Sequence, residues 1–490
     1  MIKLKKNYLT VILGLFVSIV AGCLPEDKVD WSDDGSVGVA KIADKLYLID
    51  GKDNTAKIID AGELQVGPFI SADGKMIAYA KNEYFKNADK LSELLPEDRV
   101  SVIRQYGRDI HDLIVREGSF NKDKIEKGEL FPRMQSGQFA GLVYSLIALQ
   151  ADQALLEVLK PDELKLVEEV KKQGFKLCHL YVVKLNGLET GEKRVAHISC
   201  FSMISPRISP DGKSIAYLML DDFRDDDKTT YNLYGATLDG RMGAAQIAAD
   251  VAVGYSWSGD GRKLAFIVNE SPGQKREDFM WGSLAERVIV DEQGQLQASP
   301  AADRQQYNSM ATHYGEGPKA ELAGVIFYPG TGVSYHPSGR IFFSGTPMQL
   351  PAGKLHEEKM SVFCYDPLLK TVTDVLPRGI SAPLSMSVFN FEISPDGEKL
   401  LLPLQQQRFM IYTLGQGQAI SPLDEPNAFG EKEVFKMVPA WKGNNQISCL
   451  VKKDCPFLKG VSADFMKDQA VAIIDSGGKF IDVLKLKPAE

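Results

Sequence analysis

Few residues in this chain have the type and spacing that catalysis requires. Ser256 lies in the stretch Gly254-Tyr-Ser-Trp-Ser-Gly259, which superficially resembles the strand–turn–helix elbow that presents a nucleophilic serine. The stretch runs on into Asp260-Gly261, which is typical of a β-hairpin turn and not of the start of a helix. We therefore expect no catalytic role for Ser256.

The histidines show no pairwise spacing typical of a metal site. They are His111, His179, His197, His313, His336 and His356. His179 and His197 stand at equal distances from residue 188, so a hairpin would make them cross-strand neighbours, which explains them better than a zinc pair. His313 and His356 fall in expected long loops, and both remain candidate residues for a site assembled from those loops.

An aspartate-rich segment offers the other metal-binding chemistry. Its carboxylates are the ligands that calcium prefers, but their spacing lacks the pattern of an EF-hand, so we favour a solvated loop. The residues are Asp221, Asp222, Asp225, Asp226 and Asp227. No glycine-rich phosphate loop occurs either. The sequence thus predicts no catalytic residue, no metal and no cofactor.

The cysteines suggest disulfides if the protein is exported. Cys178 and Cys200 flank an expected hairpin and are equidistant from residue 189, so either a cross-strand disulfide or two buried thiols would fit. Cys449 and Cys455 could close a short loop near the end of the chain. Cys364 would then be unpaired, in a core strand.

The N-terminus has the three parts of an export signal. Lys3, Lys5 and Lys6 precede a short apolar run over 9–21, which is too short for a comfortable transmembrane helix. Val20-Ala-Gly-Cys23 resembles a bacterial lipobox, which implies a signal peptide over 1–22 and lipid attachment at Cys23. A plain secretory signal is the alternative. By the enterobacterial sorting pattern, Leu24 favours the outer membrane, facing the periplasm.

The overall charge excludes one class of partner. Cleavage before Cys23 removes three lysines and no acidic residue, which takes the formal charge from −8 to −11. Such an acidic protein is a poor nucleic-acid binder and has no basic surface for anionic lipid. We expect contact with the membrane only through the N-terminal lipid.

A short hairpin unit recurs along the chain. In Ile208-Ser-Pro-Asp-Gly212, proline presets the turn and glycine accepts a positive φ. The other copies are Trp31-Ser-Asp-Asp-Gly35, Ile70-Ser-Ala-Asp-Gly74, Trp257-Ser-Gly-Asp-Gly261, Tyr335-His-Pro-Ser-Gly339, Ile393-Ser-Pro-Asp-Gly397 and the degenerate Trp441-Lys-Gly-Asn-Asn445. Seven copies predict an all-β, seven-bladed propeller over 30–485, with six blades as the alternative.

The second repeat is interrupted by residues 82–176. Their apolar spacing changes from a period of two to a helical period, and prolines at 96, 132 and 161 mark expected helix starts. We expect a helical insertion that caps the face carrying the other long loops. A linker over 23–29 precedes the propeller, and both end blades have their full set of expected strands. We therefore expect the ring to close through side-chain contacts alone.

The repeat Ser-Pro-Asp-Gly-x-x-Ile-Ala-Tyr resembles that of TolB-like propellers and of the propellers in prolyl oligopeptidases. The resemblance covers roughly residues 30–485 outside the insertion and implies the fold more than the function. The resemblance to TolB implies a six-bladed propeller that follows an α/β domain. The resemblance to prolyl oligopeptidases implies a propeller that accompanies a hydrolase domain. The sequence contains neither of these additional domains.

Two functional hypotheses remain. The first is a non-catalytic envelope lipoprotein whose long-loop face binds a protein or cell-wall ligand. Its basis is the growth of loops on one face, the predicted lipid and the lack of catalytic spacing. The alternative is a periplasmic carbohydrate-active hydrolase or lyase with an active site built from loops.

Overall fold

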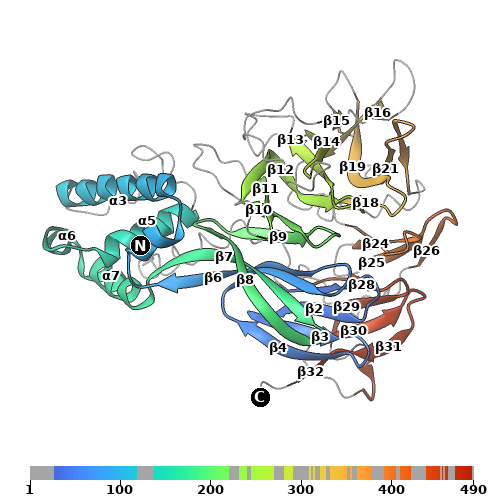
Figure 1. Cartoon of the computed structure of the whole chain (residues 1–490), viewed down its shortest axis with the longest axis horizontal. Coiled ribbons are helices and arrows are strands. Elements are labelled where there is room, and N and C mark those ends of the chain that lie inside the picture. The colour runs from blue at the N-terminus through green and yellow to red at the C-terminus, as the bar shows by residue number, and fades with distance from the viewer. Residues whose placement is uncertain are drawn as a thin grey trace, which may run out of the picture.

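The computed structural model consists mainly of antiparallel β-strands in successive hairpin units. In Figure 1 these units follow one another in chain order round a circuit that returns to its start. The structure describes residues 27–117, 137–219, 231–239, 244–269, 281–290, 308–310, 313–314, 321–326, 332–349, 354–355, 361–376, 391–403, 409–420, 437–452, 455, 458–461 and 469–487.

The repeat turns share one hydrogen-bond pattern. Ser209 Oγ donates to Asp211 Oδ1 at 2.6 Å and accepts from the Ser214 amide at 3.0 Å. Gly212 follows with a φ of 71°, which only glycine adopts without strain. The same serine–aspartate bond recurs at Ser32–Asp34, Ser71–Asp73, Ser258–Asp260 and Ser394–Asp396. The turn aspartates are therefore structural.

The first sheet joins the two ends of the described chain. Its order is β27–β1–β2–β3–β4–β32. Its strands are β1 (Asp27–Trp31), β2 (Val37–Ile42), β3 (Lys45–Asp50), β4 (Thr55–Ala61), β27 (Met437–Val438) and β32 (Lys485–Leu486). Both late strands pair in parallel with early ones, β27 with β1 and β32 with β4. The expectation of closure by side chains alone is thus wrong, because backbone hydrogen bonds join both edges.

The second sheet has two unusually long central strands. It contains β5 (Leu64–Ile70), β6 (Met76–Phe85), β7 (Phe175–Asn186) and β8 (Glu189–Ser199). Pairing of β6 with β7 continues to Phe85 opposite Phe175. These strands therefore take residues at both ends of the 82–176 range, and the helices occupy a shorter segment between them.

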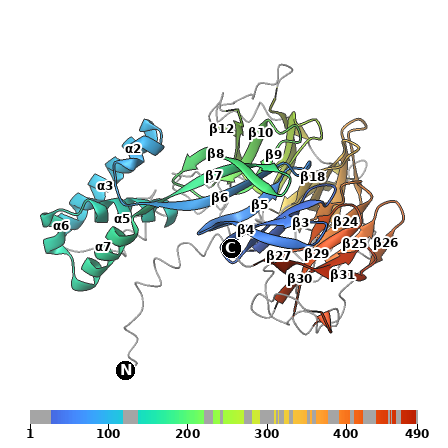
Figure 2. The ribbon, with the colours of Figure 1, turned by 60° about the horizontal axis from the view of Figure 1, so that its bottom comes forward.

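Helices lie between β6 and β7. They are α2 (Lys90–Leu94), α3 (Glu97–Glu117), α5 (Gly137–Leu149), α6 (Gln153–Val158) and α7 (Pro161–Gln173). Apolar residues of α2, α3, α5 and α6 share one buried cluster with Phe175 and Leu177 of β7, and α7 packs against α5. In Figures 1 and 2 they extend to one side of the sheets. The expected cap over the face that carries the long loops stays a prediction.

The third to fifth repeat turns lie in one continuous sheet of 14 strands. The strand β12 pairs with β11 through its first half and with β13 through its second. The strands are β9 (Met203–Ile208), β10 (Ser214–Met219), β11 (Tyr231–Thr237), β12 (Ala245–Trp257), β13 (Lys263–Asn269), β14 (Trp281–Val288), β15 (Asn308–Met310), β16 (His313–Tyr314), β17 (Glu321–Ile326), β18 (Val333–Tyr335), β19 (Ile341–Gln349), β20 (Lys354–Leu355), β21 (Ser361–Asp366) and β22 (Thr371–Asp374).

Two four-stranded sheets complete the circuit. One contains β23 (Glu392–Ile393), β24 (Lys399–Pro403), β25 (Phe409–Thr413) and β26 (Gln418–Ile420). The other contains β28 (Ala440–Lys442), β29 (Gln446–Lys452), β30 (Gln469–Asp475) and β31 (Phe480–Val483). The described strands thus form five sheets. The fold is an all-β propeller with six blades, so the prediction of seven blades is wrong and the stated alternative of six is confirmed.

The first strands of neighbouring units contact one another. β1 packs against β5 and β28, β5 against β9, β12 against β18, and β23 against β28. Three tryptophans just before repeat turns reinforce these contacts. The indole of Trp31 donates to Ser448 Oγ at 3.0 Å, that of Trp257 to the Arg207 carbonyl at 3.0 Å, and that of Trp441 to the Glu392 carbonyl at 3.3 Å. These strands line the inside of the circuit.

Within the residues that the structure describes, no helix has the length and apolar character needed to cross a membrane. The predicted signal peptide and Cys23 lie outside those residues.

Candidate functional site

Several residues singled out in the sequence lie outside the described part of the chain, namely the aspartates at 221–227 and His356. Ser256 is described and lies in β12, followed by the hairpin to β13. Its Oγ accepts the Tyr335 amide at 3.1 Å and thereby ties β18 to β12. This arrangement agrees with the predicted absence of a nucleophile elbow.

His179 and His197 do not face each other. In the β7–β8 register His179 lies opposite Ile198, and His197 lies opposite Leu180. His179 stacks near Phe85 and Tyr181, whereas His197 stacks near Tyr217. The predicted cross-strand histidine pair is therefore wrong, because register shifts along β8 place the two rings on opposite faces.

The five cysteines within the described residues carry thiols in this structure. Cys178 lies opposite Ser199, so Cys200 is one residue out of register with it. Cys449 and Cys455 are buried in one apolar cluster with no disulfide between them. Cys364 is buried in β21, as expected. The two disulfides stay predictions. Among the described residues, no group of three histidine, cysteine or acidic side chains is placed to hold a metal ion.

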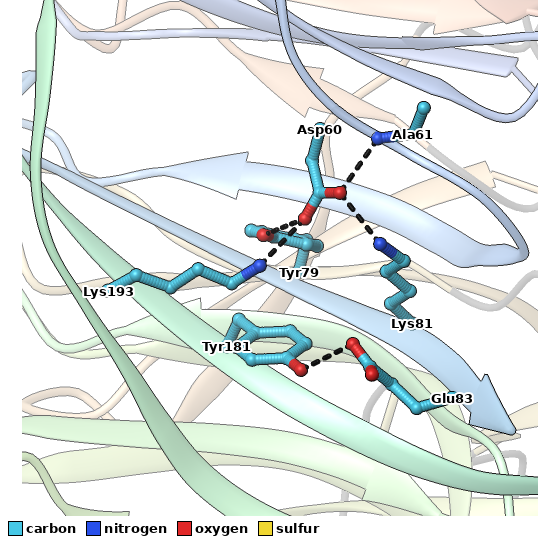
Figure 3. A network of polar contacts seen from close by, with 7 residues as sticks. All are labelled: Asp60, Ala61, Tyr79, Lys81, Glu83, Tyr181 and Lys193. Atoms are coloured by element: carbon cyan, nitrogen blue, oxygen red, sulfur yellow. Dashed lines mark hydrogen bonds and ion pairs between the residues drawn. The ribbon is translucent and has the colours of Figure 1, made fainter. Parts of the chain in front are cut away.

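Two polar clusters remain as candidates for the functional site. The first, which we call the Asp60 network, joins β4 to the second sheet (Figure 3). Asp60 accepts hydrogen bonds from Tyr79 Oη at 2.5 Å, Lys81 Nζ at 2.7 Å and Lys193 Nζ at 2.8 Å. Beside it, the hydroxyl of Tyr181 donates to Glu83 at 2.6 Å. Lys193 also lies 3.9 Å from the centroid of the Tyr181 ring.

The polar groups of the Asp60 network are already hydrogen-bonded to one another. Burial opposes ionisation of Asp60, but the bonds from Lys193, Lys81 and Tyr79 outweigh it and hold its pKa well below the usual range. Burial, together with the bond to Asp60, raises the pKa of Tyr79 far above its usual range. The carboxylate thus stays ionised, and the phenol stays neutral, with their partners already bound. We assign this network to holding two sheets together.

The second cluster, which we call the axial cluster, lies on the first strands inside the circuit. Asp30, Phe69, Arg207 and Glu392 each stand two residues before the first polar residue of a repeat turn. Lys28 precedes Asp30 by two residues and shares its face of β1. The five side chains come from β1, β5, β9 and β23, in four different sheets.

The two cations of the axial cluster share one aromatic ring. Lys28 Nζ lies 3.2 Å from the centroid of the Phe69 ring, and the Arg207 guanidinium carbon lies 4.9 Å from it. Lys28 Nζ is also 3.9 Å from Asp30 Oδ1. Asp30 accepts the Ile70 amide at 2.9 Å, which fixes β1 against β5. A cation over a desolvated ring gains roughly 2 kcal/mol, so the ring helps to hold both charges.

The axial cluster is charged but remains accessible. Burial lowers the pKa of Lys28 to about 8; Asp30 opposes this shift and Arg207 reinforces it. Burial also raises the pKa of Glu392, against the effect of Lys28. Even so, Lys28 keeps 16% of its side-chain surface accessible, and Arg207 is exposed. Accessible charges with shifted pKa values are typical of sites that meet a ligand.

Sequence reasoning missed this cluster, although a signal was present. Alignment of the repeats on their turns places Asp30, Phe69, Arg207, Ser256, Ser334, Glu392 and Ala440 in one column. Charges recur in that column beside an apolar column one residue later. Reading the columns would have marked Asp30, Arg207 and Glu392 as residues that converge.

Comparisons with known proteins add only distant likenesses. No protein-family model and no curated protein matches the chain. Similar solved structures include a puromycin hydrolase at 12% identity and a TM-score of 0.38, covering 65% of this chain. A candidate TolB from Agrobacterium tumefaciens has 13% identity and a TM-score of 0.35, covering 60% of this chain and 84% of its own. An oligogalacturonate lyase in complex with manganese has 11% identity and a TM-score of 0.39, covering 79% and 76%.

The chain spans only 45% of the puromycin hydrolase. The predicted likeness to TolB-like and peptidase-type propellers is confirmed as a structural similarity, since such proteins are among the neighbours. These neighbours have different activities, so they select none for this chain.

Proposed function

We propose that this protein is an exported, lipid-anchored binding protein of the bacterial envelope, and that its ligand contacts the axial cluster. One observation carries the proposal, namely that accessible charged side chains from three sheets meet inside the circuit beside an aromatic ring from a fourth. Side chains that only packed the sheets together would be apolar there, like Trp31, Ile70, Ile208 and Ile393 one position further along each strand.

Contrast with the Asp60 network supports this choice. Asp60 has three side-chain donors and only 14% of its side-chain surface accessible, so no group is left for a ligand. The axial cluster has weaker internal pairing, and its Arg207 is exposed without a carboxylate partner among the described residues. Binding sites need polar groups whose hydrogen-bonding capacity is not already filled.

The envelope location rests on the N-terminal pattern ending in Cys23. A lipid there would hold the propeller within a few residues of the membrane, because β1 begins at Asp27. The ligand would then be an envelope protein or a cell-wall component, and the outer membrane is the expected site of anchoring.

Binding without turnover can be tested on the purified protein lacking residues 1–22. Melting temperatures would be measured with cell-wall fragments and acidic and neutral sugars, and each mixture would be analysed for products by mass spectrometry. A raised melting temperature with unchanged compound supports the proposal. Conversion of a bound compound would refute the non-catalytic function.

A carbohydrate lyase or hydrolase is the second candidate function, and Lys28 is the observation that favours it. An amine with a pKa of about 8 is partly neutral near physiological pH and can remove a proton. Arg207 nearby could bind the substrate. Metal analysis and the product search above distinguish this candidate, because a stoichiometric transition metal with product formation would favour the enzyme.

A further inference from the structure

Arg207 is the one guanidinium of the axial cluster, and its position is well defined. Its carbonyl accepts the Trp257 indole at 3.0 Å, and its guanidinium carbon lies 5.8 Å from the Tyr255 ring. Tyr255 is itself fixed, since its hydroxyl donates to the Ala216 carbonyl at 2.7 Å. The backbone and the surrounding rings therefore hold this residue in place before any ligand arrives.

The guanidinium has no acidic partner of its own. Among the residues that the structure describes, no carboxylate oxygen lies within 4.0 Å of Arg207, although Asp30 and Glu392 belong to the same cluster. Lys28 differs, because it has Asp30 at 3.9 Å and the Phe69 ring at 3.2 Å. The unfilled donors of the cluster are thus concentrated on an exposed arginine.

We propose that the axial cluster binds a ligand carboxylate, which Arg207 holds through two parallel N–H···O hydrogen bonds. The planar guanidinium matches a carboxylate in this way, whereas a lysine acts as a point charge. The inference rests on the proposed function and names the group that the ligand must present.

Charge selects a carboxylate over a phosphate. The cluster combines two basic side chains, Lys28 and Arg207, with two acidic ones, Asp30 and Glu392. A phosphate dianion would bring twice the negative charge of a carboxylate to the two acidic side chains. Like charges in a partly desolvated site repel strongly, so we expect the monoanion to be preferred.

Two sources of such a carboxylate are separable by calorimetry. The first arm compares D-galacturonate with neutral D-galactose, and the second compares N-acetyl-D-alanine with its amide. Inorganic phosphate serves as the competing anion. We expect at least one acid to bind about tenfold or more tightly than its neutral counterpart, which is the usual loss when a charged hydrogen-bond partner is missing. Binding of D-galacturonate would identify a glycan as the source of the carboxylate, and binding of N-acetyl-D-alanine would identify a peptide terminus.

Substitutions locate the binding. Arg207→Gln should weaken the acid about tenfold or more, and Arg207→Lys should fall between the two because it keeps the charge without the bidentate geometry. Arg194→Gln, at an exposed arginine of β8, is the matched control and should change nothing. Arg207→Gln loses its contacts with the Phe69 and Tyr255 rings but stays exposed, so its melting temperature should fall only slightly, and circular dichroism would show that the variant is folded.

Four results would overturn the carboxylate assignment: no acid binds, neutral probes bind equally, phosphate binds as tightly, or Arg207→Gln binds normally. Binding of neutral probes alone would refute this inference while leaving the binding function intact. Turnover of a bound acid would instead refute the non-catalytic function while supporting recognition of the carboxylate.

Discussion

The substitution Asp60→Asn tests how the first two sheets are held together. It keeps the shape of the side chain but removes the charge that Lys81, Lys193 and Tyr79 share. Asparagine can accept at one oxygen only, and its amide would face a lysine. Two cations would then lie together near the buried ring of Tyr79, which is 2% exposed.

The expected cost follows from the burial of each partner. Breaking a buried ion pair by removing one partner costs about 3–5 kcal/mol. Asp60 and Lys81 are largely buried, with 14% and 17% of their side chains exposed, but Lys193 is 41% exposed and is screened by water. We therefore expect a loss of about 2–3 kcal/mol in the free energy of unfolding.

Urea denaturation followed by tryptophan fluorescence measures this loss as a lower midpoint with an unchanged slope. Glu93→Gln is the matched control, because its ion pair with Lys90 is about half exposed and should contribute less than about 1 kcal/mol. A loss for Asp60→Asn no larger than the control's would refute the assignment of this network as a structural clasp.

The pH dependence of the same pair of proteins adds a second check. The pKa of Asp60 is lowered in the folded protein, so its stabilisation is present above the ordinary aspartate value of about 3.9. That stabilisation is lost as the pH falls through the lower folded value. The gap between wild type and Asp60→Asn should stay constant from about pH 5 to 8 and narrow in acid.

Three further predictions follow from other contacts. Lys442→Met should lower the free energy of unfolding, measured in urea, by about 2–4 kcal/mol. Lys442 Nζ donates at 2.6 Å to both the Gly51 carbonyl and Asn54 Oδ1, and these bonds join the last sheet to the first. An unchanged urea midpoint would contradict this role. His111→Gln should lower the melting temperature at pH 5.5 but not at pH 8.5. Despite partial burial, Asp112 and Asp152 raise the pKa of His111, and the resulting stability is lost as the pH rises through the raised value. Cys23→Ser should abolish labelling with a fatty acid, and retained labelling would refute lipid attachment at Cys23.

The hairpins could be predicted because their causes are local. Ser209 and Asp211 bond within their own turn, and Gly212 supplies the positive φ, so five residues specify each unit. Alternating apolar residues then fixed the strands on either side. The propeller class followed from repetition of this unit, whereas the number of blades and the closure of the ring did not.

Long-range pairing could not be predicted in this way. The parallel pairs β1–β27 and β4–β32 join residues about 400 positions apart, and nothing in either short segment marks its partner. The pairing of Cys178 with Ser199 depends on register shifts in the β7–β8 hairpin, which symmetry about the turn does not reveal. The axial cluster depends on how the sheets are placed around the circuit, so it became visible only in three dimensions.

The location of the bound carboxylate tests the central claim most directly. Crystals of the protein soaked with 4-bromobenzoate would place this acid by the anomalous signal of its bromine. We predict that its carboxylate lies within hydrogen-bond distance of the Arg207 guanidinium, beside Phe69, and that it is absent from crystals of Arg207→Gln. An ordered probe found only outside the axial cluster, for example beside Lys193, would contradict the proposed site. A probe that still occupies the axial cluster in crystals of Arg207→Gln would contradict it as well.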